Sequence, residues 1–392
     1  MTEEVLDIPF ADAFSFDPSP TWERLRDEAP VIRVRTLAGA VVWLVTRYDD
    51  VKLVLADPRF SRAGVVAEDA PRVGVSKPLP GTLPTTDPPE HTRLRKLVSG
   101  AFAHRRIELT RPWVRELADG LAEDVARAGD HADLRQLVAL PLPIQVICTL
   151  LGVPYEDRET FRGWTELAYS MEMSEQVRVE AAMTSLLDYM AGLVAAKLRA
   201  PASEDLLDDL CRTDLTESEL VAFGLNLLVA GHETSANQIT SFVATLLRDP
   251  AHWDRLARRP DLVPSAVEEL LRFTRLSEVG QLRVALEDVE IAGVAIRAGE
   301  GVMASIGSAN RDPRAFPNPD ELDLERTPNQ HLALGVGAHF CLGAQLARIE
   351  LQETLWALST RFPRLRLAKP AEELPWRRVL VSGLSELPVL PG

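Results

Sequence analysis

The residues best placed to do chemistry lie in the segment from Leu334 to Glu350, which reads L-G-V-G-A-H-F-C-L-G-A-Q-L-A-R-I-E with Cys341 at its centre. Gly335 and Gly337 permit backbone turns that a residue with a Cβ resists, so a tight loop is predicted before the cysteine. Apolar residues recur at helical spacing after Gly343, which predicts a helix just beyond the sulfur. Free N–H groups at a helix N-terminus favour a thiolate, the form of cysteine that binds a metal ion.

A second group of polar residues interrupts a long apolar stretch. Residues 216–219 read T-E-S-E, the capping-box pattern of a helix N-terminus, and the apolar run that follows continues almost to Leu247. At about 1.5 Å per residue, about 30 helical residues would extend about 45 Å, enough to cross a domain. Gly231 in its middle costs a helix about 1 kcal/mol relative to alanine, which indicates close approach of another group. Thr234 can donate to a carbonyl one turn back and open the helix locally.

The cysteine segment also carries a family resemblance. Taken singly, a cysteine such as Cys341 is more often a small buried apolar residue than a ligand. The combination G-x-G-x-H-x-C-x-G followed by a helix is more specific, and it resembles the haem-ligand loop of the cytochrome P-450 family, the haem-thiolate monooxygenases, in the form found in soluble bacterial members. The resemblance implies that Cys341 is the axial ligand of the iron of haem b and that His339 contacts a haem propionate. Leu334 stands where the family usually has an aromatic residue.

The helix with the interrupting glycine is similar to the family's oxygen-binding groove. Its sequence A-G-H-E-T matches the place where an acid and an alcohol supply protons to the reaction, although alone it is a weak signal and a packed glycine is the commoner reading. By resemblance, Gly231 lies against the haem, and Glu233 and Thr234 are the catalytic pair. Ser235 replaces a frequent second threonine.

Two further motifs supply basic residues. His91 and Arg95 lie four positions apart in D-P-P-E-H-T-R-L-R-K-L-V, so they share one helix face, which on charge alone would more often be solvated. This stretch resembles the family's helix beneath the haem, whose histidine and arginine hold the propionates. Arg283 in Q-L-R-V-A-L-E-D-V matches another propionate arginine. Carboxylates on a buried cofactor need cationic donors because an unpaired charge is costly in low dielectric.

The fold implied by the resemblance is mainly α with small β-sheets. It is a single triangular helical domain over residues 1–392, with the haem between the long central helix and the helix after the cysteine loop. Glu269 and Arg272 match the buried E-x-x-R pair that locks the family's core. The third member of that group, an arginine, is absent where Glu321 stands, so Arg326 or another base is expected to replace it.

Other segments are expected to form strands or to line a substrate pocket. Residues 31–35 and 41–46 are β-branched runs that predict a hairpin, and residues 21–28 predict a short helix. Residues 60–89 form a long irregular loop, which in the family roofs the pocket. The pocket candidates are Val65, Val66, Leu79 and Leu83, with residues 276–281 and 379–381; Trp376 begins the last hairpin. Residues 155–178 match a mobile lid and hold Glu166, Met171, Glu172, Met173 and Glu175, either as a solvated face or as an acidic lid for a substrate amine.

Composition narrows the class of protein. The chain has 392 residues, 46% hydrophobic, with 28 prolines and no linker or repeat that divides it. Three cysteines make a disulfide framework improbable, and the acidic N-terminus lacks a leader pattern, so a cytoplasmic protein with no membrane contact is expected. A net charge of −15 argues against nucleic-acid binding. A monomer is expected.

The function expected from the resemblance is monooxygenation. One oxygen atom of O2 is inserted into a C–H bond or a double bond of a fairly large apolar small molecule. The run T-P-N-Q-H-L at 327–332 looks most like actinobacterial members that tailor secondary metabolites such as macrolides. Electrons are expected from a ferredoxin with its reductase, docked on the basic side chains of Arg93, Lys96, Arg105, Arg106, Arg111 and Arg348. Two alternatives stay open, a haem-thiolate sensor or carrier and a haem-free interaction protein.

Overall fold

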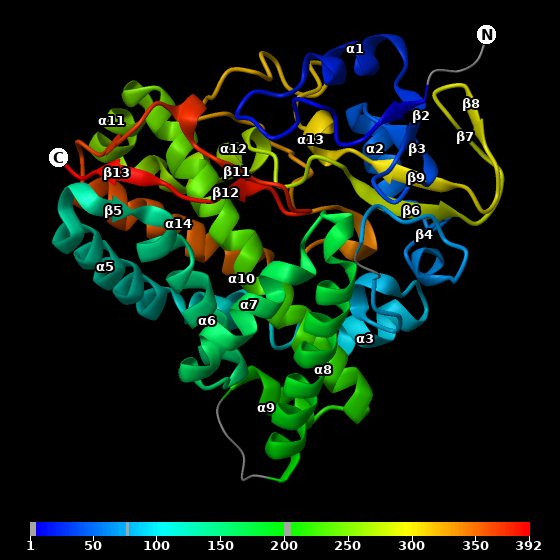
Figure 1. Ribbon diagram of the computed structural model, residues 1–392, viewed down its shortest axis with the longest axis horizontal. Coiled ribbons are helices and arrows are strands. Elements are labelled where there is room, and N and C mark those ends of the chain that lie inside the picture. The colour runs from blue at the N-terminus through cyan, green and yellow to red at the C-terminus, as the bar shows by residue number, and fades with distance from the viewer. Residues whose placement is uncertain (1–4, 76–77, 200–204) are drawn as a thin grey trace.

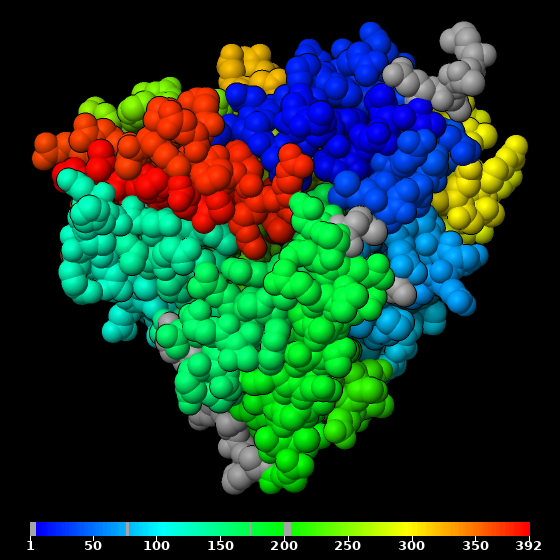
Figure 2. Space-filling view, in the orientation of Figure 1, coloured from blue at the N-terminus to red at the C-terminus, as the bar shows by residue number. Residues whose placement is uncertain are grey.

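The protein folds as a roughly triangular body in which helices occupy much of the left and lower parts of the view and the largest sheet lies at the upper right (Figure 1, Figure 2). The computed structural model describes residues 5–75, 78–199 and 205–392. The mainly α architecture with small β-sheets that the sequence predicts is confirmed.

The helices have these bounds: α1 (Pro20–Glu28), α2 (Tyr48–Ala56), α3 (Glu90–Ser99), α4 (His104–Glu108), α5 (Arg111–Ala128), α6 (Pro141–Leu151), α7 (Arg158–Ala168), α8 (Gln176–Arg199), α9 (Leu206–Cys211), α10 (Glu217–Arg248), α11 (Pro250–Arg258), α12 (Val263–Phe273), α13 (Ile306–Ala309) and α14 (Ala344–Arg361). The strands are β1 (Leu6–Asp7), β2 (Val31–Arg35), β3 (Val41–Val45), β4 (Phe60–Ser61), β5 (Ala132–Asp133), β6 (Gln281–Ala285), β7 (Val289–Ile291), β8 (Val294–Ile296), β9 (Gly301–Ala304), β10 (Arg366–Leu367), β11 (Trp376–Arg377), β12 (Gly383–Leu384) and β13 (Pro388–Leu390).

The largest sheet follows the order β1-β2-β3-β9-β6-β4. The predicted hairpin is present: β2 and β3 pair antiparallel with Val31 opposite Val45, and β3 then pairs parallel with β9. β6 lies between β9 and β4, with Arg283 opposite Val302. The predicted last hairpin is β11 with β12, in which Trp376 pairs with Leu384. The sheet therefore brings β6, and with it Arg283, to the edge of the helical part.

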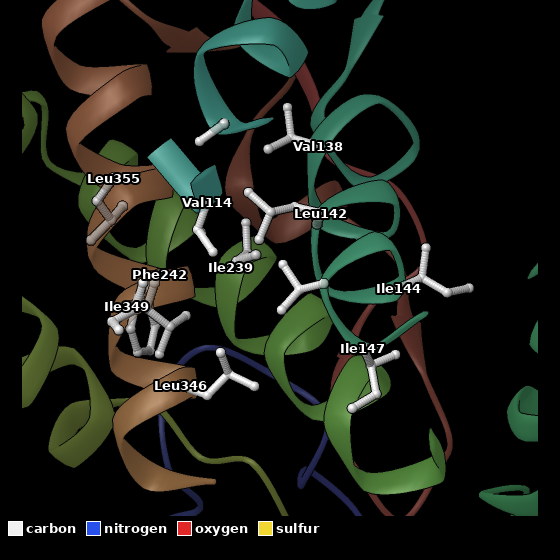
Figure 3. Close-up of a cluster of buried hydrophobic side chains, with 14 of the residues drawn as sticks. Val114, Val138, Leu142, Ile144, Ile147, Ile239, Phe242, Leu346, Ile349 and Leu355 are labelled. Carbon is white, nitrogen blue, oxygen red and sulfur yellow. The ribbon is translucent and has the colours of Figure 1, made fainter. Parts of the chain in front are cut away.

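The helix α10 crosses the middle of the molecule (Figure 1). It spans 32 residues and begins with the predicted capping box, since the Thr216 side chain accepts from the Glu219 N–H and the Glu219 carboxylate accepts from the Thr216 N–H. It packs against α6, α8 and α14. Its C-terminal half is buried around Ile239 and Phe242, which pack against Leu142 of α6 and Ile349 of α14 (Figure 3). This contact holds α14, and the cysteine loop before it, in a fixed position relative to α10.

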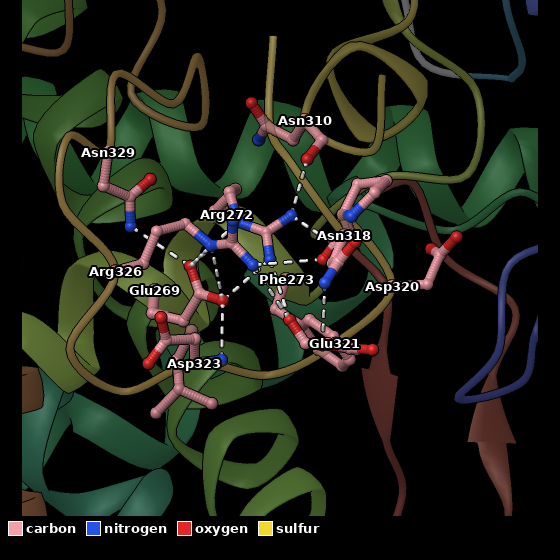
Figure 4. A network of polar contacts seen from close by, with 12 residues as sticks. Glu269, Arg272, Phe273, Asn310, Asn318, Asp320, Glu321, Asp323, Arg326 and Asn329 are labelled. Atoms are coloured by element: carbon pink, nitrogen blue, oxygen red, sulfur yellow. Dashed lines mark hydrogen bonds and ion pairs between the residues drawn. The ribbon is translucent and has the colours of Figure 1, made fainter. Parts of the chain in front are cut away.

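A buried charge network fixes the loop ahead of the cysteine segment (Figure 4). Glu269 and Arg272 of α12 form a two-bond ion pair at 2.7 and 2.8 Å, with both side chains fully buried. The Arg326 Nε donates to both Glu269 oxygens at 3.1 Å, so Arg326 replaces the missing third arginine. Arg272 also donates to the carbonyls of Asn310 and Pro319. These bonds connect α12 to three points of the segment between α13 and the cysteine loop.

One helix has the length and apolar composition of a membrane span, which the sequence reading did not identify. This helix is α8, residues Gln176–Arg199, and a single such helix is weak evidence for a membrane. Its residues Val179, Leu186, Met190 and Val194 are buried in the protein core at helical spacing. Packing within the fold thus accounts for its apolar face.

Candidate functional site

The cysteine loop, α3, α10 and β6 surround a cavity of about 650 Å³. The wall holds seven of the eight residues predicted from the sequence to bind a cofactor, bind a metal or act in catalysis. They are His91, Arg95, Gly231, Thr234, Arg283, His339 and Cys341. The eighth, Glu233, does not line the cavity. Residues from four separate parts of the chain are thus brought to one place.

Cys341 is partly exposed and lines the cavity, two residues before the N-cap of α14 at Gly343. Gly335 and Gly337 both have φ of +73°, and a Cβ on Gly337 would lie 3.0 Å from the Ala56 Cα, which is why the loop uses glycine. The Cys341 N–H donates to the Leu334 carbonyl at 2.8 Å and closes the loop. The predicted tight loop followed by a helix is confirmed.

The helix N-terminus favours the Cys341 thiolate in the predicted direction, since the Gly343 N–H lowers the pKa of Cys341, but other effects act on the thiol as well. Burial raises the pKa of Cys341, and this effect outweighs the Gly343 N–H and the positive charges of Arg95 and Arg348, which lower it. Deprotonation of a buried thiol requires a further positive charge at the sulfur, and a bound metal cation supplies one.

Two histidines stack beside the cysteine loop. The ring centroids of His91 on α3 and His339 in the loop are 4.3 Å apart, and the His91 Nε2 is buried without a hydrogen-bond partner. Burial lowers the pKa of both rings; for His339, burial together with His91, Arg283 and Arg62 lowers it to about 3. Both rings are therefore neutral near pH 7 and keep N–H donors for an acceptor in the cavity.

Arg283 is almost fully buried, and its guanidinium faces other positive charges. It donates to the Leu282 carbonyl at 3.1 Å and to the Gln281 Oε1 at 3.3 Å, and no carboxylate in the described part of the chain forms an ion pair with it. Burial lowers its pKa to about 8, and the neighbouring Arg62 contributes. A buried cation without an anion is unfavourable by itself, so this position is suited to an anionic ligand.

Sequence reasoning missed Arg62. It lines the cavity next to the predicted cluster, donates to the carbonyls of Pro84 and Leu282, and has its pKa lowered to about 10 by burial. Asp87 accepts from the Arg62 N–H at 2.8 Å and so fixes the start of the long loop. Arg62 directly follows the two-residue strand β4, in a stretch without a regular pattern. No motif there could have predicted that it lines the cavity. Arg95, which was predicted, donates to the Ala338 carbonyl at 3.1 Å.

The α10 wall of the cavity lies opposite the cysteine loop. The Thr234 hydroxyl donates to the Ala230 carbonyl one turn back at 2.7 Å, as predicted. A Cβ on Gly231 would lie 3.0 Å from Ile147 Cδ1 on α6. The close approach predicted at Gly231 is therefore made by α6, and the glycine leaves the cavity wall flat between Ala230 and Thr234.

Glu233 points away from the cavity. Its Oε2 accepts from Arg377 at 2.9 Å and from Asn237 at 3.3 Å, and its Oε1 is buried without a partner. Burial alone would raise the pKa of Glu233, but Arg377, His232 and Arg135 outweigh burial and lower it. The carboxylate is therefore charged and lies one residue behind the Thr234 hydroxyl, on the side of α10 that faces β11.

A buried acid that the sequence did not reveal also lines the cavity. Glu350 of α14 is fully buried, its Oε1 has no partner, and burial raises its pKa to about 8 despite a hydrogen bond with Ser235. No sequence pattern indicated this position, because the hydrogen-bond partner Ser235 lies on another helix, α10. At pH 7 this carboxyl is uncharged.

The predicted pocket segments are partly correct. Val65 and Leu83 line the cavity, as do residues of 277–282 and Leu380, whereas Val66 and Leu79 do not. None of Glu166, Glu172 and Glu175 lines it. Glu166 pairs with Arg162 and Glu175 with Arg178 and Ser170, so the solvated-face reading of the lid applies to them. Met171 is buried in the core, and the side chain of Met173 lies outside the described residues.

Comparisons with known proteins agree with this arrangement. Residues 172–365 match the family described as Cytochrome P450. The chain is 48% identical to nocardicin C N-oxygenase of Nocardia uniformis subsp. tsuyamanensis, over 97% of each chain. It is 43% identical to mycinamicin IV hydroxylase/epoxidase of Micromonospora griseorubida, over 97% of this chain and 98% of that one. The crystal structure of the LnmA cytochrome P450 hydroxylase of Streptomyces atroolivaceus S-140 superposes with a TM-score of 0.88 at 48% identity, covering 98% and 100% of the two chains.

The cavity, the Cys341 sulfur and these similarities define a monooxygenase with a haem-thiolate cofactor, and the chain belongs to the cytochrome P450 family. Within that family it is of the actinobacterial type that tailors secondary metabolites by hydroxylation or epoxidation, using O2 and a small-molecule substrate.

The residues around the cavity fit the family's cofactor. A haem carries two propionates, and the cavity wall offers the buried, unpartnered His91 Nε2 together with the Arg283 guanidinium, which lacks an anion. The Cys341 sulfur lies on the same wall. Donors for two carboxylates and one soft ligand for iron are therefore present in a cavity of suitable size.

Proposed function

We propose that this protein binds haem b through Cys341 and oxygenates a fairly large apolar secondary metabolite. The observation that carries the proposal is the position of Cys341, which lines a 650 Å³ cavity together with His91, Arg283 and the stretch of α10 around Gly231. When bound, the haem supplies the activation of O2, and a thiolate donor to its iron favours O–O cleavage. The apolar lining, which includes Val65, Phe223 and Leu380, suits an apolar substrate.

Four basic groups are proposed to orient the cofactor. His91, Arg95, Arg283 and His339 would bind its propionates, and Arg62 adds a fifth donor. The support is electrostatic, because burial and mutual repulsion already lower the pKa values of Arg283 and His339. Two bound carboxylates would remove that penalty, which makes the site selective for a dianionic ligand.

Thr234 and Glu233 are proposed to move protons to the reacting oxygen. The Thr234 hydroxyl donates to the Ala230 carbonyl, so its oxygen is free to accept from water and to hold a proton donor at the cavity wall. Glu233 is charged and bonded to Arg377, whose side chain is 15% exposed. A rotation of Glu233 away from Arg377 would connect solvent with the Thr234 side of α10.

The reduced protein's absorption spectrum with and without carbon monoxide tests the cofactor assignment. A strongly red-shifted Soret band is expected for the wild type, and its loss is expected for Cys341→Ser with haem still bound. Cys148→Ser is the matched control, because Cys148 is buried in the core away from the cavity and should leave the band unchanged. A wild-type band at the position of histidine-ligated haem would contradict the proposal.

Electrons are proposed to come from a ferredoxin with its reductase. The expected docking surface is partly neutralised, since Arg93, Arg106, Arg111 and Arg348 pair with carboxylates of the chain itself. Lys96 and Arg105 are exposed and carry the remaining positive charge. We expect Arg105→Glu with Arg106→Glu to slow reduction by an acidic ferredoxin and to leave reduction by dithionite unchanged. Equal rates with ferredoxin would argue against this surface.

A haem-thiolate sensor or carrier is the alternative. It needs the cysteine loop but not an alcohol opposite the sulfur. Thr234→Ala is expected to uncouple O2 consumption from product formation and to raise peroxide release in an oxygenase. Retained function after this change would instead favour the sensor or carrier.

A further inference from the structure

One arginine of the cavity wall lies apart from the basic groups assigned to the cofactor. Arg72 belongs to the long loop between β4 and α3, and its side chain lines both the cavity and a surface depression shared with Gly39 of the β2–β3 hairpin and Gln176 of α8. It therefore lies at the mouth of the cavity.

The backbone at Arg72 is fixed on both sides. The Thr36 hydroxyl, itself buried, donates to the Arg72 carbonyl at 2.6 Å. The preceding Pro71 packs into a space left by Gly301, where a Cβ would lie 2.7 Å from the Pro71 ring and 2.8 Å from Val42. The loop is thereby attached to the hairpin and to β9. The backbone that carries Arg72 is therefore anchored to the sheet on the cavity wall.

Arg72 has no ion-pair partner in the described part of the chain, although Asp69 lines the same surface depression. Its guanidinium takes part in no ion pair and no hydrogen bond there, although many arginines of this acidic protein are paired. Among the described residues that line the cavity, the one with a carboxyl is Glu350 on α14, whose pKa burial raises to about 8. The lid glutamates do not line the cavity and are bonded to other arginines or are exposed.

We propose that Arg72 is a specificity residue that binds an anionic group, a carboxylate, of the substrate at the mouth of the cavity. This rests on the proposed monooxygenase function and names the substrate class: an apolar molecule with a carboxylate at one end. With the carboxylate at Arg72, the apolar body extends along the apolar lining of the cavity toward Thr234 on α10, where the oxidised carbon lies. Among the described residues, none of the glutamates of the predicted acidic lid lines this wall, which does not support that lid as a site for a substrate amine.

The test uses two ligands of nearly equal size, laurate and methyl laurate, titrated into the purified holoprotein. Binding is followed by the Soret shift and by calorimetry. We expect the wild type to bind laurate about tenfold more tightly than the ester, because a partly buried guanidinium–carboxylate pair is charge-assisted. Added salt should weaken laurate binding only.

Three variants sharpen the result. Arg72→Gln should bind the two ligands equally, Arg72→Lys should restore part of the preference, and Arg72→Glu should favour dodecyltrimethylammonium over laurate. Arg35→Gln is the control, because Arg35 is an exposed arginine of the same hairpin that faces Asp7. All variants should retain the carbon monoxide band of the wild type.

Three results would overturn the inference. The wild type could bind acid and ester equally, or it could fail to bind laurate at millimolar concentration. The third result is an unchanged preference for laurate in Arg72→Gln. If the carbon monoxide spectrum lacks the red-shifted band, the proposed function fails instead. A normal band without acid preference contradicts only the role of Arg72.

Discussion

Arg272 and Arg283 are buried to the same degree but have different surroundings. Each has a relative exposure of 1%. Arg272 forms two bonds with the Glu269 carboxylate and donates to the carbonyls of Asn310 and Pro319. Arg283 donates to one carbonyl and one amide oxygen, and a second arginine, Arg62, lies close enough to lower its pKa.

The contrast between Arg272 and Arg283 distinguishes buried charges that stabilise the fold from buried charges that are suited to bind a ligand. A buried ion pair with all its donors bonded has its desolvation offset within the chain. A buried guanidinium without an anion is unfavourable, and binding of an anionic ligand would offset this cost. Such a group is therefore suited to a binding site. Buried basic groups without an anion therefore mark the cofactor end more specifically than burial alone does.

The largest expected effect is the loss of Arg272. Arg272→Met leaves the Glu269 carboxylate buried with Arg326 as its remaining basic partner and leaves the carbonyls of Asn310 and Pro319 without their donor. We expect a destabilisation of about 3–5 kcal/mol, measured by urea unfolding. Arg255→Met is the matched control, since Arg255 pairs with Glu325 on the surface and should change stability by less than about 1 kcal/mol. Similar losses in both variants would contradict the contrast.

An intermediate effect is expected from Glu350, which is a buried acid without a cation. Its pKa is about 8 in the fold and 4.5 in the unfolded chain, so the folded state binds more protons between these values. Its contribution to stability is complete below pH 4.5 and is lost as the pH rises through 8, a decline of a few kcal/mol. Thermal midpoints at pH 5 and pH 8 should fall more in the wild type than in Glu350→Gln. Parallel shifts in the two proteins would mean that Glu350 titrates normally.

Much of the site followed from the sequence because its motifs are local. The turn glycines, Cys341 and the A-G-x-E-T pattern determine a loop and a helix from neighbouring residues, and the seven groups they and the basic motifs identify do meet at one cavity. Arg326 as the third arginine was one of several options, and the fold decided it through the loop that ends near Glu269. A local sequence pattern was therefore sufficient to predict the parts of the site whose hydrogen bonds and turns involve neighbouring residues.

The sequence was insufficient to predict the features of the site that depend on tertiary packing. Arg62 and Glu350 line the cavity because β4 and α14 are placed there by contacts far along the chain, which no spacing records. The cause of Gly231 was also not readable, since it is Ile147 of α6 that approaches it. Glu233 next to Thr234 suggested a shared groove, but successive helix residues point about 100° apart, and Glu233 faces Arg377 instead.

The smallest effect on folding is expected from a methionine substitution at Arg283. This variant is also the sharpest test of the contrast with Arg272. Arg283→Met removes a cation whose burial is not offset by an anion of the chain, so the thermal midpoint should change little. The cost should instead appear in cofactor retention, because a propionate would lose a charge-assisted donor of about 1.5–3 kcal/mol. Transfer of haem to apomyoglobin should then be about tenfold faster or more. A large drop in midpoint with unchanged haem transfer would place Arg283 with Arg272 among the residues that hold the fold.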